Sequence, residues 1–307
     1  MARVSIVGSG NVGANTAFFI AEKGVTDVLL VDIKQGLSRG KALDIMEAAP
    51  IRRYRNSLVG SDSLADIQGS QMVVIAVGAI RSPGMRREDL FHENAPLVRT
   101  LASEVARLAP NSVVVMATEP VDSLTALFAL RSGMPRTRVL GLGGILDSMR
   151  LRALIARELG VSMEIVSALV IGRHSDDMIC LPRYCSVSGV PLPQLLPPER
   201  IAALVSETRS AGDLLVELAK RSSAYYAPSA GIAELADSVH MNLSRIFSVS
   251  VLLDGEYGVR GAALSVPAVI GEKGVERILT PELTRDEKDI LGQSARLIAS
   301  VVQGGAA

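Results

Sequence analysis

The chain has 307 residues, of which 48% are hydrophobic and 21% are charged, which is typical of a globular protein and not of a disordered one. Lysine plus arginine equals aspartate plus glutamate at 32 each, so the charge gives no reason to expect nucleic acid or an anionic membrane as a partner. No apolar run approaches the about 18 residues of a membrane span, and a strand begins almost at the N-terminus, so we expect a cytoplasmic protein.

The first elements are a strand at residues 3–7, a glycine-rich turn and a helix that ends near Lys23. In a turn of this kind Gly8 permits the tight bend, Gly10 lets the backbone approach a pyrophosphate, and Gly13 allows close packing of helix on strand. The amide groups at the helix N-terminus then face the phosphates. The sequence therefore predicts a dinucleotide site at Gly8-Ser9-Gly10-Asn11-Val12-Gly13.

The next apolar run, residues 28–31, ends in Asp32, which follows Gly13 by 19 residues. An acidic residue at the end of this strand suits the two ribose hydroxyls of NAD and would repel the extra phosphate of NADP. NAD is therefore the expected cofactor. The alternative is a glycine-rich turn in an unrelated α/β protein.

Strands and helices go on alternating as far as about residue 145, which predicts an α/β fold with a doubly wound parallel sheet. The run 72–77 is short, continuous and apolar, which is typical of a strand buried on both faces of a parallel sheet. The predicted elements are helix 37–48, strands 57–60 and 72–77, helix 88–108, strand 113–116, helix 121–130 and strand 139–140.

The pattern changes after residue 145, and we expect a mixed α+β domain there. The chain would then divide into a dinucleotide-binding domain, 1–144, and a substrate domain, 145–307. The elements predicted for the second half are helix 146–159, strand 166–171, helices 201–219 and 226–245, strands 248–253 and 263–270, and helix 284–302.

Three histidines narrow the search for a general base. His92 and His240 fall inside predicted helices, whereas His174 follows strand 166–171 in the polar loop Gly-Arg-His-Ser-Asp-Asp. An imidazole titrates near neutral pH, so His174 suits proton transfer, although a structural histidine would give the same pattern.

The two cysteines, Cys180 and Cys185, are not accompanied by further Cys or His residues at metal-site spacing. We therefore expect free thiols and no bound metal.

Three arginines are candidates for binding an acidic substrate. Arg81 and Arg87 lie on a Pro-Gly loop after a sheet strand, and Arg150 lies three residues after Asp147 on a predicted helix. A planar guanidinium binds a carboxylate through two parallel hydrogen bonds, which a small acidic substrate would require. A solvated loop and a surface ion pair on a helix would leave the same pattern.

These motifs occur in the order of a known family. The chain resembles the malate dehydrogenases of the lactate/malate dehydrogenase superfamily, especially the bacterial group whose sequences are similar to lactate dehydrogenase, and the resemblance covers nearly its whole length. It is carried by GSGNVG, GKALDIMEAAPI, IRSPGMRREDL, GILDSMRLR, SAYYAP, DGEYG and VPAVIG. It implies a Rossmann NAD-binding domain and reversible hydride transfer between malate and NAD, a reaction of the tricarboxylic acid cycle.

By motif position, the resemblance implies that His174 donates and accepts the proton and that Asp147 holds its imidazole. Arg150 would bind the 1-carboxylate of the substrate, and Arg87 would close with its loop to polarise the reacting carbonyl. Arg81 would meet the distal carboxylate, so the expected substrate is a small dicarboxylate, malate or oxaloacetate.

The resemblance also implies a pocket wall at Ala224, with room beside the substrate, and a homodimer or homotetramer. The cofactor contacts it implies are Gly8, Ser9, Gly10, Asn11, Val12, Gly13, Asp32, Asn94, Ala117, Thr118 and Glu119.

The chain departs from the family pattern at three places. Glu119 replaces an asparagine that binds substrate beside the nicotinamide, Arg173 and Ser175 replace the glycines that flank His174, and Ala79-Ile80 replaces a proline before the loop. A carboxylate near an anionic substrate matters, because like charges about 4 Å apart repel by about 4 kcal/mol at an effective dielectric of about 20.

We hypothesise that Arg173 forms an ion pair with Glu119 and so neutralises it. Without that pair, Glu119 would raise the pKa of His174 and weaken oxaloacetate binding. Two alternatives to malate oxidation stay open on the sequence: a dehydrogenase for a different 2-hydroxy acid, and an NAD-binding protein with impaired catalysis.

Overall fold

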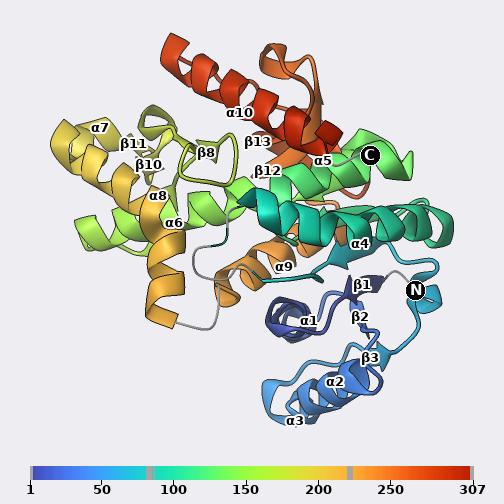
Figure 1. Ribbon diagram of the computed structural model, residues 1–307. Helices are drawn as coiled ribbons and strands as arrows, with labels where there is room; N and C mark the ends of the chain where they lie inside the picture. Colours follow the sequence, from blue (N-terminus) through green and yellow to red (C-terminus); the bar gives the residue numbers. More distant parts are fainter. Residues whose placement is uncertain (1–2, 81–84, 86, 220–223, 305–307) are drawn as a thin grey trace.

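The computed structural model describes residues 3–80, 85, 87–219 and 224–304, without the side chains of residues 87 and 88. Its main feature is a nine-stranded sheet in the order β14-β13-β12-β6-β5-β4-β1-β2-β3 (Figure 1). Strands β1 to β6 pair in parallel, as a doubly wound sheet requires. These six strands are β1 Arg3–Val7, β2 Asp27–Val31, β3 Leu58–Ser61, β4 Met72–Ile75, β5 Val113–Met116 and β6 Val139–Gly141.

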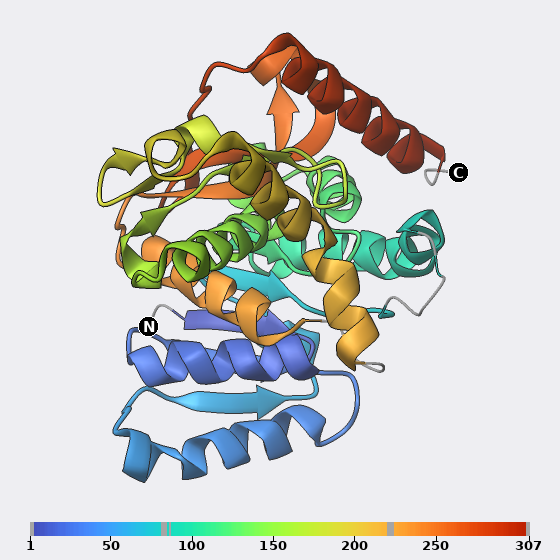
Figure 2. The same ribbon diagram turned by 90° about the vertical axis from the view of Figure 1, so that its left-hand side faces the viewer.

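Helices cover both faces of this sheet. Helices α1 and α9 pack against each other on one face, and α4 and α5 pack against each other on the other (Figures 1 and 2). The predicted α/β fold class is confirmed. The helices of the first half are α1 Asn11–Lys23, α2 Leu37–Glu47, α3 Ala49–Arg52, α4 Arg87–Leu108 and α5 Val121–Ser132, with short 3₁₀ turns at Leu64–Ile67 and Arg136–Arg138.

The second half adds strands to the same sheet, which the sequence did not indicate. Strand β12 pairs antiparallel with β6, and β13 and β14 follow it outward. The strands are β7 Val166–Ser167, β8 Val170–Ile171, β9 Ile179–Cys180, β10 Ser186–Val187, β11 Val190–Pro191, β12 Arg245–Asp254, β13 Arg260–Gly271 and β14 Gly274–Ile278. The helices are α6 Gly143–Leu159, α7 Leu192–Leu195, α8 Pro198–Ala219, α9 Tyr226–His240 and α10 Arg285–Gly304, with 3₁₀ turns η3 Met163–Ile165, η4 Pro182–Tyr184 and η5 Glu256–Gly258.

Two predicted elements of this half depart from the structure by more than a shift of a few residues at one end. The helix expected over 226–245 ends at His240, because Asn242 and Ser244 have φ angles of 52° and 49°, which a right-handed helix cannot contain. The strand expected over 166–171 is two short strands, β7 and β8, which belong to different sheets.

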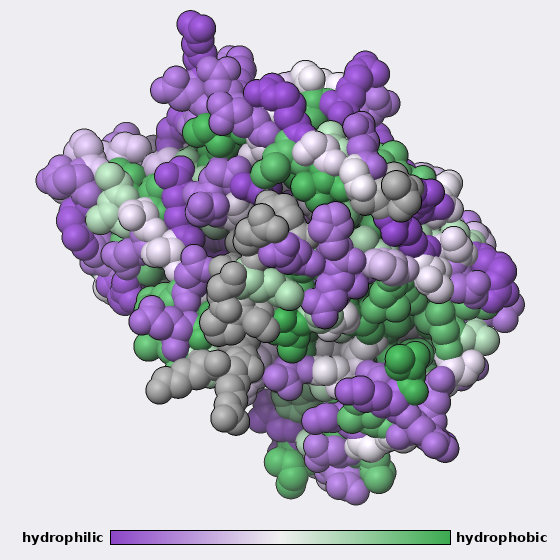
Figure 3. All heavy atoms as spheres, in the orientation of Figure 1, coloured by the Kyte–Doolittle hydropathy of each residue, from purple (hydrophilic) through white to green (hydrophobic). Residues whose placement is uncertain are grey.

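One hydrophobic core joins strands of both halves, and a smaller core lies between α6, α8 and β8. All four residues of β4 are buried, so the prediction that this strand is covered on both faces is confirmed. All four residues of the neighbouring strand β5 are buried as well. On the surface seen in Figure 3, hydrophobic residues are scattered among hydrophilic ones. Among the described residues, no helix combines the length and apolar character needed to cross a membrane.

Candidate active site

The glycine-rich turn connects β1 to α1 at the carboxyl end of the sheet. Gly8 has a φ of 107°, and a Cβ on Gly13 would lie 1.8 Å from the Gly8 carbonyl oxygen, so the chain can pass here only with glycine at both places. A Cβ on Gly10 would meet nothing within 4 Å, so the turn is open on its outer side. Helix α1 has no side-chain cap and no acidic residue in its first turn, which leaves its N-terminal amides available to an anion.

Asp32 lies beside this turn. One carboxylate oxygen accepts the Ser9 amide at 2.8 Å, and the other accepts the Lys34 amide at 3.0 Å. The structure therefore brings the end of β2 to the glycine turn, where a carboxylate can bind a ribose diol.

Asn94 joins the loops that follow β4 and β5. Its Oδ1 accepts the Ala79 amide at 2.7 Å, and its Nδ2 donates to the Glu119 carbonyl at 2.8 Å. The Thr118 hydroxyl donates to the Val77 carbonyl at 2.6 Å in the same region. Asn94 thus fixes the position of Glu119 through the backbone, while contact of Asn94 with a cofactor stays a prediction.

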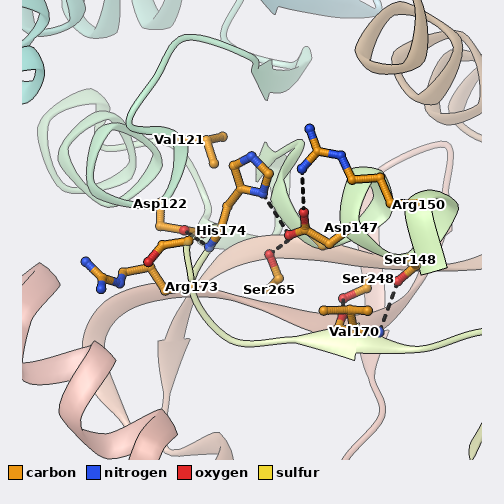
Figure 4. A network of polar contacts seen from close by, with 12 residues as sticks. Val121, Asp122, Asp147, Ser148, Arg150, Val170, Arg173, His174, Ser248 and Ser265 are labelled. Atoms are coloured by element: carbon orange, nitrogen blue, oxygen red, sulfur yellow. Dashed lines mark hydrogen bonds and ion pairs between the residues drawn. The ribbon is translucent and has the colours of Figure 1, made fainter. Parts of the chain in front are cut away.

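His174 lies in the loop after β8, held at both its backbone and its ring. Its amide donates to Asp122 Oδ2 at 2.6 Å, and its Nδ1 lies 2.7 Å from Asp147 Oδ2 (Figure 4). The imidazole side chain is only 10% exposed and the Asp147 side chain 2%. A buried carboxylate on Nδ1 leaves Nε2 as the nitrogen available for proton transfer.

The charges around this histidine determine its ionisation. Burial by itself lowers the pKa of His174, but the carboxylates of Asp147 and Glu119 outweigh it and raise the pKa to about 9, against a smaller opposing effect of Arg150. His174 is therefore an imidazolium at neutral pH. Burial also raises the pKa of Asp122, to about 6, although the hydrogen bond from the His174 amide opposes the shift.

Arg150 projects from the helix that carries Asp147. Its Nη1 lies 3.3 Å from Asp147 Oδ1, and its side chain is 14% exposed, so this is not a solvated surface pair (Figure 4). Among the described residues Asp147 is its one hydrogen-bonded partner, so most of its five N–H donors can bind an anionic ligand.

A cavity of about 320 Å³ is lined by Arg150, His174 and other residues from both halves of the chain. Cationic, anionic and apolar side chains share its wall, so it suits a small polar molecule that reacts beside a larger cofactor. Its lining includes Val12, Ala117, Glu119, Arg150, His174 and Ala224.

Two predicted residues fall partly or wholly outside what the structure describes. Arg81 lies outside the described residues, and Arg87 begins α4 with its side chain outside them. Their suggested contacts with substrate stay predictions.

The hypothesis that Arg173 neutralises Glu119 was wrong. Arg173 Nε instead donates to both carboxylate oxygens of Asp177, at 3.0 and 3.2 Å, and its side chain points away from the imidazole (Figure 4). Asp177 is the nearer partner because it lies four residues further along the same loop. The Glu119 carboxylate lies 3.4 Å from His174 Nε2.

Sequence reasoning missed Asp122, and also Arg209 and Asp213, which lie on α8 and line the cavity. An acidic residue in the first turn of the helix after Pro120 is a signal that points to Asp122. No local sequence pattern indicates that Arg209 and Asp213 line the cavity, and only the tertiary packing of α8 shows it. Both cysteines are free and buried, and among the described residues no three His, Cys, Asp or Glu side chains are grouped to hold a metal.

The sequence matches two domains of one family. Residues 2–141 match the lactate/malate dehydrogenase NAD binding domain, and residues 145–307 match the alpha/beta C-terminal domain. Malate dehydrogenase from Desulforudis audaxviator is 42% identical over 98% of each chain, and that of Bacillus subtilis is 40% identical over 98% of this chain and 97% of its own.

Solved structures agree in fold. Malate dehydrogenase from Cryptosporidium parvum superposes with a TM-score of 0.95 at 33% identity, over 99% of this chain and 98% of that one. Lactate dehydrogenase from the same organism, complexed with lactic acid and β-nicotinamide adenine dinucleotide, gives a TM-score of 0.94 at 34% identity with the same coverage.

Proposed function

The chain belongs to the lactate/malate dehydrogenase family, and we propose that it is an NAD-dependent malate dehydrogenase, which reversibly oxidises (S)-malate to oxaloacetate. The observation that carries the proposal is the cavity in which His174 and Arg150 face Val12 of the glycine turn, so that acid–base, carboxylate-binding and cofactor-binding groups meet. The relatives' names favour this function over a different 2-hydroxy acid or an inactive NAD-binding protein.

The glycine turn fits NAD. Its outer side is open at Gly10, the α1 amides can bind a pyrophosphate, and Asp32 stands where a ribose diol would reach it. The residues proposed to contact the cofactor are those of the turn from Gly8 to Gly13, with Asp32, Asn94, Ala117, Thr118 and Glu119.

The chain's own residues bind the substrate and handle the proton. When bound, NAD supplies the hydride acceptor for malate oxidation, and NADH the donor for oxaloacetate reduction. In reduction, His174 donates the Nε2 proton to the C2 oxygen, and Asp147 stabilises the imidazolium and fixes the ring. Arg150 binds the 1-carboxylate in a bidentate pair.

Loop residues complete the proposed site. Arg81 binds the distal carboxylate, and Arg87 polarises the C2 carbonyl when the loop closes and excludes water. Two cations for two carboxylates account for a preference for a dicarboxylate over pyruvate.

We place the enzyme in the cytoplasm and in the tricarboxylic acid cycle, as a homodimer or homotetramer. Exposed apolar side chains support an oligomer, since α8 presents Leu214 at 52% and Leu218 at 70% exposure. The change from parallel to antiparallel strands after β6 supports the division into an NAD-binding domain, 1–144, and a substrate domain, 145–307.

The test is NADH oxidation by purified protein with oxaloacetate, pyruvate and other 2-oxo acids, repeated with NADPH. We expect oxaloacetate to exceed pyruvate in kcat/KM by about 10²-fold or more, because an unpaired distal cation disfavours the monocarboxylate. NADH should exceed NADPH. Equal turnover of pyruvate, or cofactor binding without turnover, would contradict the proposal.

A further inference from the structure

The loop that carries His174 is anchored where it leaves β8. Gly172 exchanges both backbone hydrogen bonds with Ser265 of β13, at 2.8 and 2.9 Å, and turns the chain with a φ of 90°. The His174 amide then donates to Asp122 Oδ2 at 2.6 Å (Figure 4). These bonds fix the loop as far as His174, and the residues that follow are held by a different group.

That group is Asp177, which binds the residues on both sides of His174. Its two carboxylate oxygens accept Arg173 Nε at 3.0 and 3.2 Å. Its Oδ1 also accepts the Ser175 hydroxyl at 2.6 Å, which is shorter than the 2.9 Å from that hydroxyl to Asp176 Oδ1. Arg173 and Ser175 do not have positive φ angles, so the backbone does not require glycine at either position and both side chains serve as donors.

The same carboxylate reaches a second element of the fold. Its Oδ2 accepts the hydroxyl of Ser294 at 2.7 Å, and Ser294 lies on the buried face of α10. Helix α10 packs against β9 and β13, so its position is fixed by the core. The other buried residues of this face are Leu291, Ala295, Ile298 and Val302. Asp177 therefore connects the loop to a firmly packed helix.

Asp177 is ionised in this arrangement. Burial by itself raises the pKa of Asp177, but the hydrogen bonds from the two serines and from Arg173 outweigh burial and lower the pKa below its ordinary value. The side chain of Arg173 is 19% exposed and that of Asp177 31%, so the pair is partly shielded from solvent. Hydrogen bonds to an ionised acceptor are stronger than those between neutral groups, which makes this connection a firm one.

We propose that Asp177 is a positioning residue for the reaction: its carboxylate binds the residues on both sides of His174 and fastens their loop to Ser294 of α10, which keeps the imidazole in place in the cavity wall. This role rests on the proposed function, because proton transfer needs Nε2 at one position relative to the substrate. A displacement of about 1 Å at a reacting group can slow a reaction by about 10²-fold.

The experiment compares the wild-type protein with Asp177→Asn, which keeps the size of the side chain and removes its charge. Amides of the loop are hydrogen-bonded, so hydrogen–deuterium exchange of the peptide that covers residues 172–178, read by mass spectrometry, reports how firmly the loop is held. We expect this exchange to be about tenfold faster or more, because one hydrogen bond to a charged group stabilises by more than the free energy of a tenfold change. Asp289→Asn, which removes an exposed carboxylate from α10, is the matched control and should exchange as the wild-type protein does.

Activity separates positioning from folding. We expect kcat for oxaloacetate reduction by Asp177→Asn to fall by about tenfold to 10²-fold while KM stays within about twofold, because substrate binding is kept and the transition state is lost. The stoichiometry of NADH binding counts the folded sites and should not change.

Ser294→Ala is a second variant, which breaks the bond to α10 and leaves the pair of Arg173 with Asp177. We expect smaller changes of the same kind in loop exchange and in kcat. Its matched control is Ser300→Ala, because the exposed Ser300 hydroxyl bonds within α10, to the Leu297 carbonyl. If Asp177→Asn does not fold, Ser294→Ala carries the test alone.

Three results would decide against parts of the account. Wild-type loop exchange or wild-type kcat in the folded variants would overturn the inference. A fall in kcat matched by an equal fall in the stoichiometry of NADH binding would also overturn it, because folding alone would then explain the loss. Faster loop exchange in the variants, with no turnover of oxaloacetate by the wild-type protein, would leave the hold of Asp177 on the loop intact and reject the proposed function.

Discussion

Replacement of His174 by asparagine is expected to lower kcat for oxaloacetate reduction by about 10³-fold. General acid–base catalysis by a positioned side chain contributes roughly 10²–10⁴-fold, and Asp147 and Asp122 hold this imidazole at its ring and its amide. Asparagine has a side chain of similar reach but no group that titrates near neutral pH. The measurement is steady-state NADH oxidation with saturating oxaloacetate.

The control for this variant is cofactor binding. Asp32 is held by the Ser9 and Lys34 amides at the glycine turn, so the Kd for NADH, measured by fluorescence, should stay within about twofold of the wild-type value. A variant that binds NADH normally and retains more than a tenth of wild-type kcat would show that another group carries the proton.

Replacement of Arg150 by lysine is expected to lower kcat/KM for oxaloacetate by about 10²-fold, mainly through KM. The guanidinium is 14% exposed beside Asp147 and opens on the cavity, where it can bind a carboxylate through two parallel hydrogen bonds. Lysine keeps the charge but offers a single ammonium in place of the planar fork, and at about 1.4 kcal/mol per tenfold the loss corresponds to about 3 kcal/mol.

Arg157→Lys is the matched control, because Arg157 lies on the same helix but is an exposed partner of Glu207. Exposed ion pairs contribute at most about 1 kcal/mol, so this variant should have wild-type kinetics. If Arg150→Lys also kept the wild-type KM, the 1-carboxylate would have to bind elsewhere.

Local sequence patterns were sufficient to predict the features that depend on a single strand and the turn that follows it. The glycine turn and Asp32 each follow a strand, and parallel strands carry their carboxyl ends to one edge of the sheet, so their proximity could be predicted. The short apolar run of β4 likewise predicted burial on both faces of the sheet.

Contacts between distant segments could not be predicted in this way. The amide of His174 binds Asp122, which lies 52 residues earlier, and β12 pairs with β6 across more than a hundred residues. The partner of His174 Nδ1, Asp147, came from family resemblance, since spacing alone does not bring a helix and a loop together. Arg173 was assigned to Glu119 on charge alone, and local geometry gave it to Asp177 instead.

The most direct test of the account is the pH dependence of kcat/KM for oxaloacetate at saturating NADH. Reduction needs protonated His174, whose pKa is raised to about 9 because flanking carboxylates outweigh its burial. Activity should therefore stay level through neutral pH and fall as pH rises through about 9, while malate oxidation rises over the same range. A fall in oxaloacetate reduction centred near the ordinary histidine pKa of about 6.5, or no alkaline fall at all, would contradict a proton donor held between Asp147 and Glu119.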